Sequence, residues 1–168
     1  MKTQFKMRDL GLLSYLGIEI QQSSGITLCQ AKYTVRILEM TGMRDYNHTH
    51  TQMEEWLKLS RKSTAIEVDT TEYRRLFYSF RYLAHTRPDL SFSVRFMSLF
   101  MEWPTQEYMV AVKRIMQYVS RMINYGFHFV KEEEGQLISY RDNDLIDDID
   151  TRKTTSGALF FYGDSLVS

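Results

Sequence analysis

Hydrophobic and polar positions predict short strands at the two ends of the chain and helices between them. Two apolar runs, residues 12–21 and 26–29, flank a Ser-Ser-Gly sequence, and glycine suits the positive φ of tight turns, so we predict a β-hairpin. Apolar residues then recur at helical spacing through residues 31–40, with Gly42 placed to end that helix. The polar stretch 44–69 has no sustained period and predicts an extended connection that lies against its neighbours or crosses a domain boundary.

Three more helices are predicted in the middle of the chain. The first has an apolar stripe over residues 73–84 and ends at Arg87-Pro88-Asp89, because proline disfavours helical geometry in the residue before it. The second covers residues 90–101. The third begins after Thr105, a plausible N-cap, and repeats apolar residues on one face until shortly before Gly126.

Short strands are predicted again near the C-terminus, at residues 127–130, 136–140 and 158–162. The fold class is therefore α+β, with an N-terminal β-hairpin, a helical bundle and a C-terminal β-sheet. A length of 168 residues with 43% hydrophobic residues is enough for one or two small domains with real cores, which argues against disorder.

Composition excludes several kinds of site. A single cysteine, Cys29, allows no intrachain disulfide and no cysteine pair for a metal, and it favours a reducing compartment. The N-terminus lacks an apolar run of signal-peptide length, and no stretch approaches the length of a membrane span. We expect an intracellular protein, cytoplasmic or nuclear, that is not secreted and has no membrane partner.

Charge is divided unevenly, although the formal net charge is zero. Residues 1–130 carry 17 Lys and Arg against 12 Asp and Glu, whereas residues 131–168 carry 4 against 9. This asymmetry favours a basic body suited to phosphate contact, joined to a carboxylate-rich segment. Ordinary solvated surface charge is the alternative interpretation.

The order of these elements resembles the copia-type retrotransposon Pol polyprotein, over essentially the whole chain. Each matching motif is short, but the motifs follow one another in register. They include Asp9-Leu10-Gly11-Leu12-Leu13, Tyr73-Arg74-Arg75-Leu76, Thr86-Arg87-Pro88-Asp89, Lys113-Arg114-Ile115, and Tyr140-Arg141-Asp142-Asn143-Asp144. The resemblance implies that residues 1–125 form the thumb- and connection-like C-terminal region of reverse transcriptase, and that 126–168 form an incomplete RNase H-like domain with a truncated β-sheet.

The resemblance also implies which chemistry to expect. Polymerases hold two metal ions with clustered carboxylates, and the family's aspartate motif lies upstream of Met1. Asp142 corresponds to the first RNase H ligand, and the remaining acidic positions lie beyond Ser168. We therefore expect a remnant of the reverse transcriptase and RNase H lineage without autonomous catalysis. Mg²⁺ serves the intact family, and no cofactor is expected for this chain.

The carboxylates around Asp142 form the candidate metal site of the sequence. They are Asp142, Asp144, Asp147, Asp148 and Asp150. Their spacing lacks the glycine turn and the terminal glutamate of an EF-hand loop, so a solvated acidic turn is the competing interpretation.

Nucleic-acid contact is the function that we expect to persist, because phosphate binding needs only a suitably placed positive face. The candidate residues are Arg74, Arg75, Arg81, Lys113, Arg114 and Arg121, with an RNA/DNA hybrid or another nucleic acid as the partner. Two alternatives stay open. These charges solvate the outer sides of core helices, or the chain is a domesticated interaction module that docks an unknown protein partner.

Some positions depart from the family's pattern. Tyr78 and Arg121, together with Trp56 and Asp147, stand where a small glycine is expected. A bulky side chain at a position of positive φ or of close helix approach costs about one to a few kcal/mol, so we expect these replacements to be destabilising.

Overall fold

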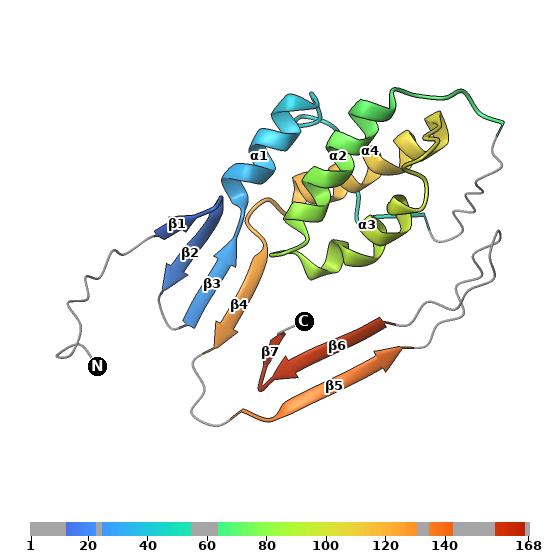
Figure 1. Cartoon of the computed structure of the whole chain (residues 1–168). Coiled ribbons are helices and arrows are strands. Elements are labelled where there is room, and N and C mark those ends of the chain that lie inside the picture. The colour runs from blue at the N-terminus through green and yellow to red at the C-terminus, as the bar shows by residue number, and fades with distance from the viewer. Residues whose placement is uncertain (1–12, 23–24, 55–63, 131–134, 143–156, 167–168) are drawn as a thin grey trace.

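Two small antiparallel sheets accompany a group of helices in the computed structural model, which describes residues 13–22, 25–54, 64–130, 135–142 and 157–166 (Figure 1). The helices of this described part are α1 (Ala31–Met40), α2 (Thr70–Leu83), α3 (Ser91–Ser98), α4 (Gln106–Arg121) and the short 3-10 helix η1 (Pro88–Leu90). The predicted α+β class is confirmed, whereas the thumb-like and RNase H-like assignments stay predictions.

The first sheet joins the N-terminal strands to a strand that follows all of the helices. Its order is β1 (Leu13–Tyr15), β2 (Ile18–Gln22), β3 (Gly25–Cys29) and β4 (Gly126–Val130), and every neighbouring pair is antiparallel. The helices therefore form an insertion between two paired strands. The expected division at residue 125 stays a prediction, but this sheet spans it.

The predicted β-hairpin is confirmed by the antiparallel pairing of β2 with β3, but the structure divides the first apolar run, residues 12–21, into β1 and β2. The turn between them consists of Leu16 and Gly17, with φ of 50° and 78°. Positive φ at both central residues matches the right-handed twist of a two-residue hairpin. Leu16 is the only non-glycine residue with positive φ among the described residues, and leucine is not a residue that signals such a turn.

The pairing of β3 with β4 depends on Gly126. A Cβ atom placed there would collide with the backbone carbonyl oxygen of Leu28 and would lie 2.9 Å from the Cα of Cys29. Those atoms belong to the backbone of the partner strand and cannot move aside alone. Only glycine therefore allows this approach.

The core lies among the helices. Its buried residues are Leu38, Met43, Tyr73, Leu76, Phe77, Phe80, Leu83, Leu90, Val94, Met97, Phe100, Tyr108, Ala111, Val112, Ile115, Met116 and Val119. They come from the apolar faces that the helical spacing predicted, so the amphipathic patterns of α1, α2 and α4 are confirmed. The predicted helix 90–101 is shorter than expected, since η1 precedes α3 and α3 ends at Ser98.

Residues 48–54 run along α4 and reach the start of α3. The backbone amide of Thr49 donates to the carbonyl oxygen of Gln117 at 3.4 Å, and Nδ1 of His48 lies 2.9 Å from Oγ of Ser120. Further along, Nε2 of Gln52 donates to the carbonyl oxygen of Asp89 at 2.7 Å. The prediction of an extended connection that lies against its neighbours is confirmed for this part, and residues 55–63 lie outside the described residues.

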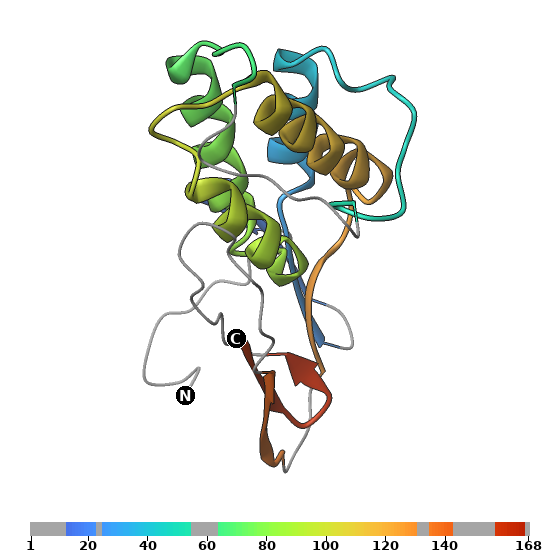
Figure 2. The same ribbon diagram turned by 90° about the vertical axis from the view of Figure 1, so that its right-hand side faces the viewer.

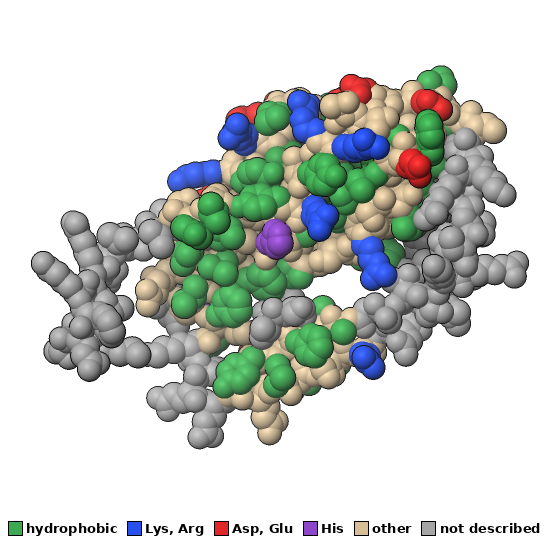
Figure 3. Space-filling view, viewed as in Figure 1, with side chains coloured by type: hydrophobic (Ala, Val, Ile, Leu, Met, Phe, Trp, Pro, Cys, Tyr) green, Lys and Arg blue, Asp and Glu red, His purple; other side chains and the backbone are tan. Residues whose placement is uncertain are grey.

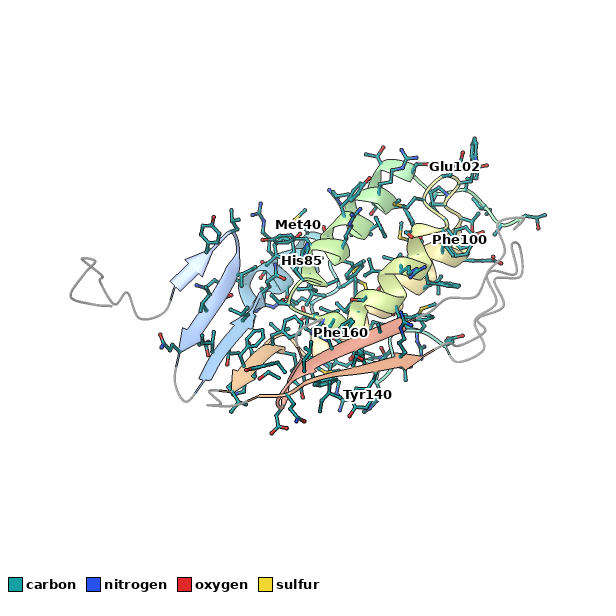
Figure 4. The ribbon with its side chains drawn as sticks, turned by 60° about the horizontal axis from the view of Figure 1, so that its bottom comes forward. Met40, His85, Phe100, Glu102, Tyr140 and Phe160 are labelled. Carbon is teal, nitrogen blue, oxygen red and sulfur yellow. The ribbon has the colours of Figure 1, made fainter. Side chains whose placement is uncertain are left out.

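The second sheet has the order β5 (Leu137–Asp142), β6 (Gly157–Tyr162) and β7 (Ser165–Leu166). Tyr140 on β5 is 60% exposed and Phe160 on β6 is 39% exposed, on opposite faces of the pair (Figure 4). Both faces of this sheet thus present apolar side chains. A hydrogen bond of 3.0 Å from the amide of Val130 to Oγ of Ser165 links it to β4.

Within the described ranges, no helix has the length and hydrophobicity needed to cross a membrane.

Candidate nucleic-acid interface

Three of the six predicted basic residues lie together on the exposed side of α2. Arg74, Arg75 and Arg81 are all exposed, and we call them the α2 basic face. No Asp or Glu occurs between residues 73 and 88, and none of the three arginines forms a salt bridge with another described residue. The guanidinium group of Arg74 is partly held, because its Nε donates to the carbonyl oxygen of Met101 at 3.2 Å.

The surrounding surface mixes basic and hydrophobic side chains. Figure 3 shows Lys and Arg side chains spread across the middle of this face, with hydrophobic side chains between them. The exposed hydrophobic side chains here include Tyr78 on α2, which is 54% exposed. Such a surface offers positive charge to phosphates and flat rings to bases.

The basic residues of α4 are engaged differently. Nη1 of Arg114 lies 3.2 Å from Oε1 of Glu54, and its Nη2 donates to Oγ1 of Thr51 at 2.9 Å. Arg121 contacts Nδ1 of His50. These two arginines therefore hold the connecting segment, which Figure 2 shows on the side of α4 away from α2. Lys113 is exposed and makes no such contact with the described residues.

The sequence predicted one role for the six basic residues, but the structure separates them into the three arginines of the α2 basic face, the engaged pair Arg114 and Arg121, and Lys113, which is exposed on α4. Arg114 and Arg121 are partners of the connecting segment, which no pattern within α4 could reveal. The α2 basic face remains available for an external ligand, because none of its three arginines forms a salt bridge with a described residue.

Arg87 is buried, with only 3% of its surface exposed, and the sequence pattern did not identify it as a site residue. Its Nε and Nη2 donate to the two carboxylate oxygens of Asp89 at 2.9 and 2.7 Å, and its Nη1 donates to the carbonyl oxygen of Met122 at 2.9 Å. The guanidinium carbon also lies 5.7 and 5.8 Å from the ring centres of Tyr118 and Tyr125. We call these five residues the Arg87 cluster.

The Arg87 cluster gives a structural role to the Thr86-Arg87-Pro88-Asp89 motif. Arg87 ties the motif to the end of α4, and Oγ1 of Thr86 donates to Oε1 of Gln30, just before α1, at 2.8 Å. The Tyr118 hydroxyl donates to Asp89 at 2.9 Å. Burial, and then this hydrogen bond, raises the pKa of Tyr118. The sequence signal that could have indicated this ion pair is the spacing of the motif, in which an arginine precedes an aspartate by two residues with a proline between them.

Asp142 is the last residue of β5, where its backbone pairs with Gly157. Its side chain, and the other carboxylates predicted with it at residues 144–150, lie outside the described part. Within the described part, no group of three His, Cys, Asp or Glu side chains is placed to hold a metal ion. The described residues thus do not supply a two-metal site, and no metal-dependent step follows from them. The proposed Asp142 ligand stays a prediction.

The expected destabilisation by bulky residues is wrong for Tyr78 and Arg121. Both lie on exposed sides of helices, and neither has positive φ. Neither side chain is buried against a neighbouring helix, so the close helix approach that would make a bulky residue costly does not occur at these positions. Trp56 and Asp147 lie outside the described residues.

Comparisons with known proteins cover the whole chain. A family described as reverse transcriptase (RNA-dependent DNA polymerase) matches residues 1–55. The chain is 36% identical over 167 residues to the retrovirus-related Pol polyprotein from transposon RE1 of Arabidopsis thaliana, which covers 98% of this chain and 11% of that protein. It is 32% identical to the retrovirus-related Pol polyprotein from transposon TNT 1-94 of Nicotiana tabacum, over 98% of this chain and 13% of that protein.

A third relative is matched over most of its own length. An uncharacterized mitochondrial protein of Arabidopsis thaliana is 34% identical over 171 residues, which cover 100% of this chain and 70% of that protein. The chain thus spans only 11% and 13% of the two Pol polyproteins but most of this relative. No solved structure matches the chain.

Proposed function

Because this chain belongs to the family of copia-type retrotransposon Pol polyproteins, we propose that it binds nucleic acid through the α2 basic face. The observation that carries this proposal is the set of three exposed arginines on one helix, without a salt bridge to any described residue and without an acid between residues 73 and 88. Arginine suits this role, since its planar guanidinium binds phosphate oxygens with paired hydrogen bonds.

An RNA/DNA hybrid is the substrate class that the family suggests, since reverse transcription produces such hybrids. Backbone contacts of this kind carry no sequence information, so we expect binding that depends on salt and tolerates any sequence.

The test compares two variants of equal net charge. One is Arg74→Gln/Arg75→Gln/Arg81→Gln, and its matched control, Lys32→Gln/Arg36→Gln/Arg95→Gln, removes three exposed positive charges from α1 and α3. Fluorescence anisotropy with a labelled RNA/DNA hybrid at low salt measures the affinity. We expect the affinity of the α2 variant to fall about tenfold or more, since three phosphate contacts are removed, and the affinity of the control to change little. If the affinity falls equally in the two variants, the loss comes from the change in net charge alone, which would contradict the proposal.

A role as a protein-interaction module is the second candidate, and the second sheet favours it. Leu137, Tyr140 and Tyr162 are 69%, 60% and 50% exposed, which leaves apolar surface uncovered among the described residues. Exposed apolar surface of this kind marks interaction sites. A complex that survives nuclease and high salt, and that does not form with Tyr140→Ser/Tyr162→Ser, would favour this candidate over phosphate binding.

Absence of catalysis by the chain alone also remains our proposal, and it rests on the family resemblance. Its test is incubation of the purified chain with Mg²⁺ and a hybrid. Cleavage of the RNA strand that disappears in Asp142→Asn would contradict it.

A further inference from the structure

Tyr78 lies at the centre of the α2 basic face. On a helix, residues three and four positions apart are surface neighbours, with Cβ atoms about 5–6 Å apart. Arg74 and Arg75 precede Tyr78 by four and three positions, and Arg81 follows it by three. All three arginines therefore border the same tyrosine. No other exposed aromatic residue of the described helices has three basic neighbours at this spacing.

The ring of Tyr78 is available to a ligand. It is 54% exposed, and its ring contact is with Phe77, in an edge geometry with centroids 5.5 Å apart. The cation–π contacts found among the described residues both involve Arg87, so no arginine of α2 covers the ring. Its hydroxyl makes no hydrogen bond with a described residue, so no polar contact within the described structure accounts for a tyrosine at this position.

We propose that Tyr78 is a stacking site for an unpaired base of single-stranded nucleic acid, whose phosphates are held by Arg74, Arg75 and Arg81. This inference rests on the proposed function and adds single-stranded nucleic acid to the RNA/DNA hybrid as a class of ligand. A rise of 1.5 Å per residue places Arg74 and Arg81 about 10 Å apart along the helix axis, so a base on the ring has positive charge on both sides. Bases within a duplex are already stacked on one another, and their faces cannot reach the ring.

The site is a property of this chain rather than of the family pattern. The resemblance predicts glycine at position 78, and a glycine there would leave the arginines without an aromatic surface. Base stacking on an aromatic side chain tolerates any sequence, because every base has a flat face, and removal of such a ring weakens binding by about tenfold.

The experiment uses the full chain and three probes: a labelled single-stranded oligodeoxythymidine, the same strand with abasic positions, and a duplex of equal length. Tyr78→Ala is compared with Tyr78→Phe, which keeps the ring, and with the control Tyr46→Ala, which removes a tyrosine that is 56% exposed on another segment. Alanine is a good helix former and position 78 is exposed, so we expect all variants to fold.

We expect Tyr78→Ala to bind the single strand about tenfold more weakly and the duplex almost unchanged, while Tyr78→Phe and Tyr46→Ala bind like the original chain. The abasic strand should bind the original chain and Tyr78→Ala equally. If Tyr78→Ala binds the single strand normally while the α2 arginine variant does not, the stacking site is wrong and the proposed function stands. If no probe binds the folded chain at low salt, both are wrong.

Discussion

The Arg87 cluster predicts a large and unusual response to Asp89→Asn. This substitution keeps the shape of the side chain and removes its charge. Arg87, only 3% exposed, would then keep its positive charge without the carboxylate that accepts two of its hydrogen bonds. An uncompensated buried charge is costly, whereas an intact buried ion pair contributes little net stability.

The magnitude follows from the exposure of the two partners. Removal of one partner from a fully buried pair costs about 3–5 kcal/mol. The side chain of Asp89 is 35% exposed, so water already weakens the pair, and we expect Asp89→Asn to cost about 2–3 kcal/mol. At a typical urea dependence of about 2 kcal/mol per M, the unfolding midpoint should fall by about 1–1.5 M.

The assay is urea unfolding followed by far-UV circular dichroism, with the double variant Arg87→Met/Asp89→Asn as the decisive comparison. Methionine removes the buried charge and fills a similar volume, so the double variant should be at least as stable as Asp89→Asn alone. The reasoning is refuted if Asp89→Asn costs less than about 1 kcal/mol. It is also refuted if the stability lost in the double variant equals the sum of the losses in Arg87→Met and in Asp89→Asn, since the two side chains would then act independently.

Three further substitutions test other parts of the fold by the same urea assay. Gly126→Ala should destabilise the chain by about 2 kcal/mol, because its Cβ would collide with the Leu28 carbonyl; an unchanged midpoint would mean that β3 and β4 do not approach as described. Thr105→Val should stabilise it by about 1 kcal/mol, because Oγ1 of Thr105 is buried without a hydrogen-bond partner and makes no cap bond; a decrease in stability would contradict this. Burial, followed by the neighbouring Tyr108, raises the pKa of Tyr73 above its ordinary value of about 10. Because the pKa of Tyr73 is higher in the folded state than in the unfolded state, the stability that Tyr73 contributes is complete below about pH 10 and is lost above it. The urea midpoint of the original chain should therefore fall from about pH 9 to 11, and Tyr73→Phe should make that fall shallower. An equal fall in both chains would contradict the raised pKa of Tyr73.

Local patterns predicted the parts of the fold that depend on neighbours in sequence. The core faces of α1 and α2 follow from apolar residues at helical spacing, and the end of α1 at Gly42 follows from backbone preference. The N-cap position of α4 at Thr105 was also predictable, but its side chain makes no cap hydrogen bond. A pattern identifies where a helix begins more reliably than which contacts satisfy its ends.

Features that depend on distant partners were not predictable in this way. The pairing of β3 with β4 joins positions about a hundred residues apart, such as Cys29 and Gly126, and nothing local to either strand specifies it. The candidate interface shows the same limit. Arg114 and Arg81 look alike in sequence, and only the position of Glu54 beside Arg114 separates a structural arginine from an available one.

The salt dependence of nucleic-acid binding tests the central claim most directly, since the slope of log K against log salt concentration grows with the number of phosphates that the protein neutralises. For a single strand, removal of three arginine–phosphate interactions should reduce the steepness of that slope by about 2. We expect this reduction in Arg74→Gln/Arg75→Gln/Arg81→Gln and a much smaller one in Lys32→Gln/Arg36→Gln/Arg95→Gln. A slope that is the same in the original chain and in the α2 variant would show that the α2 basic face does not contact phosphates.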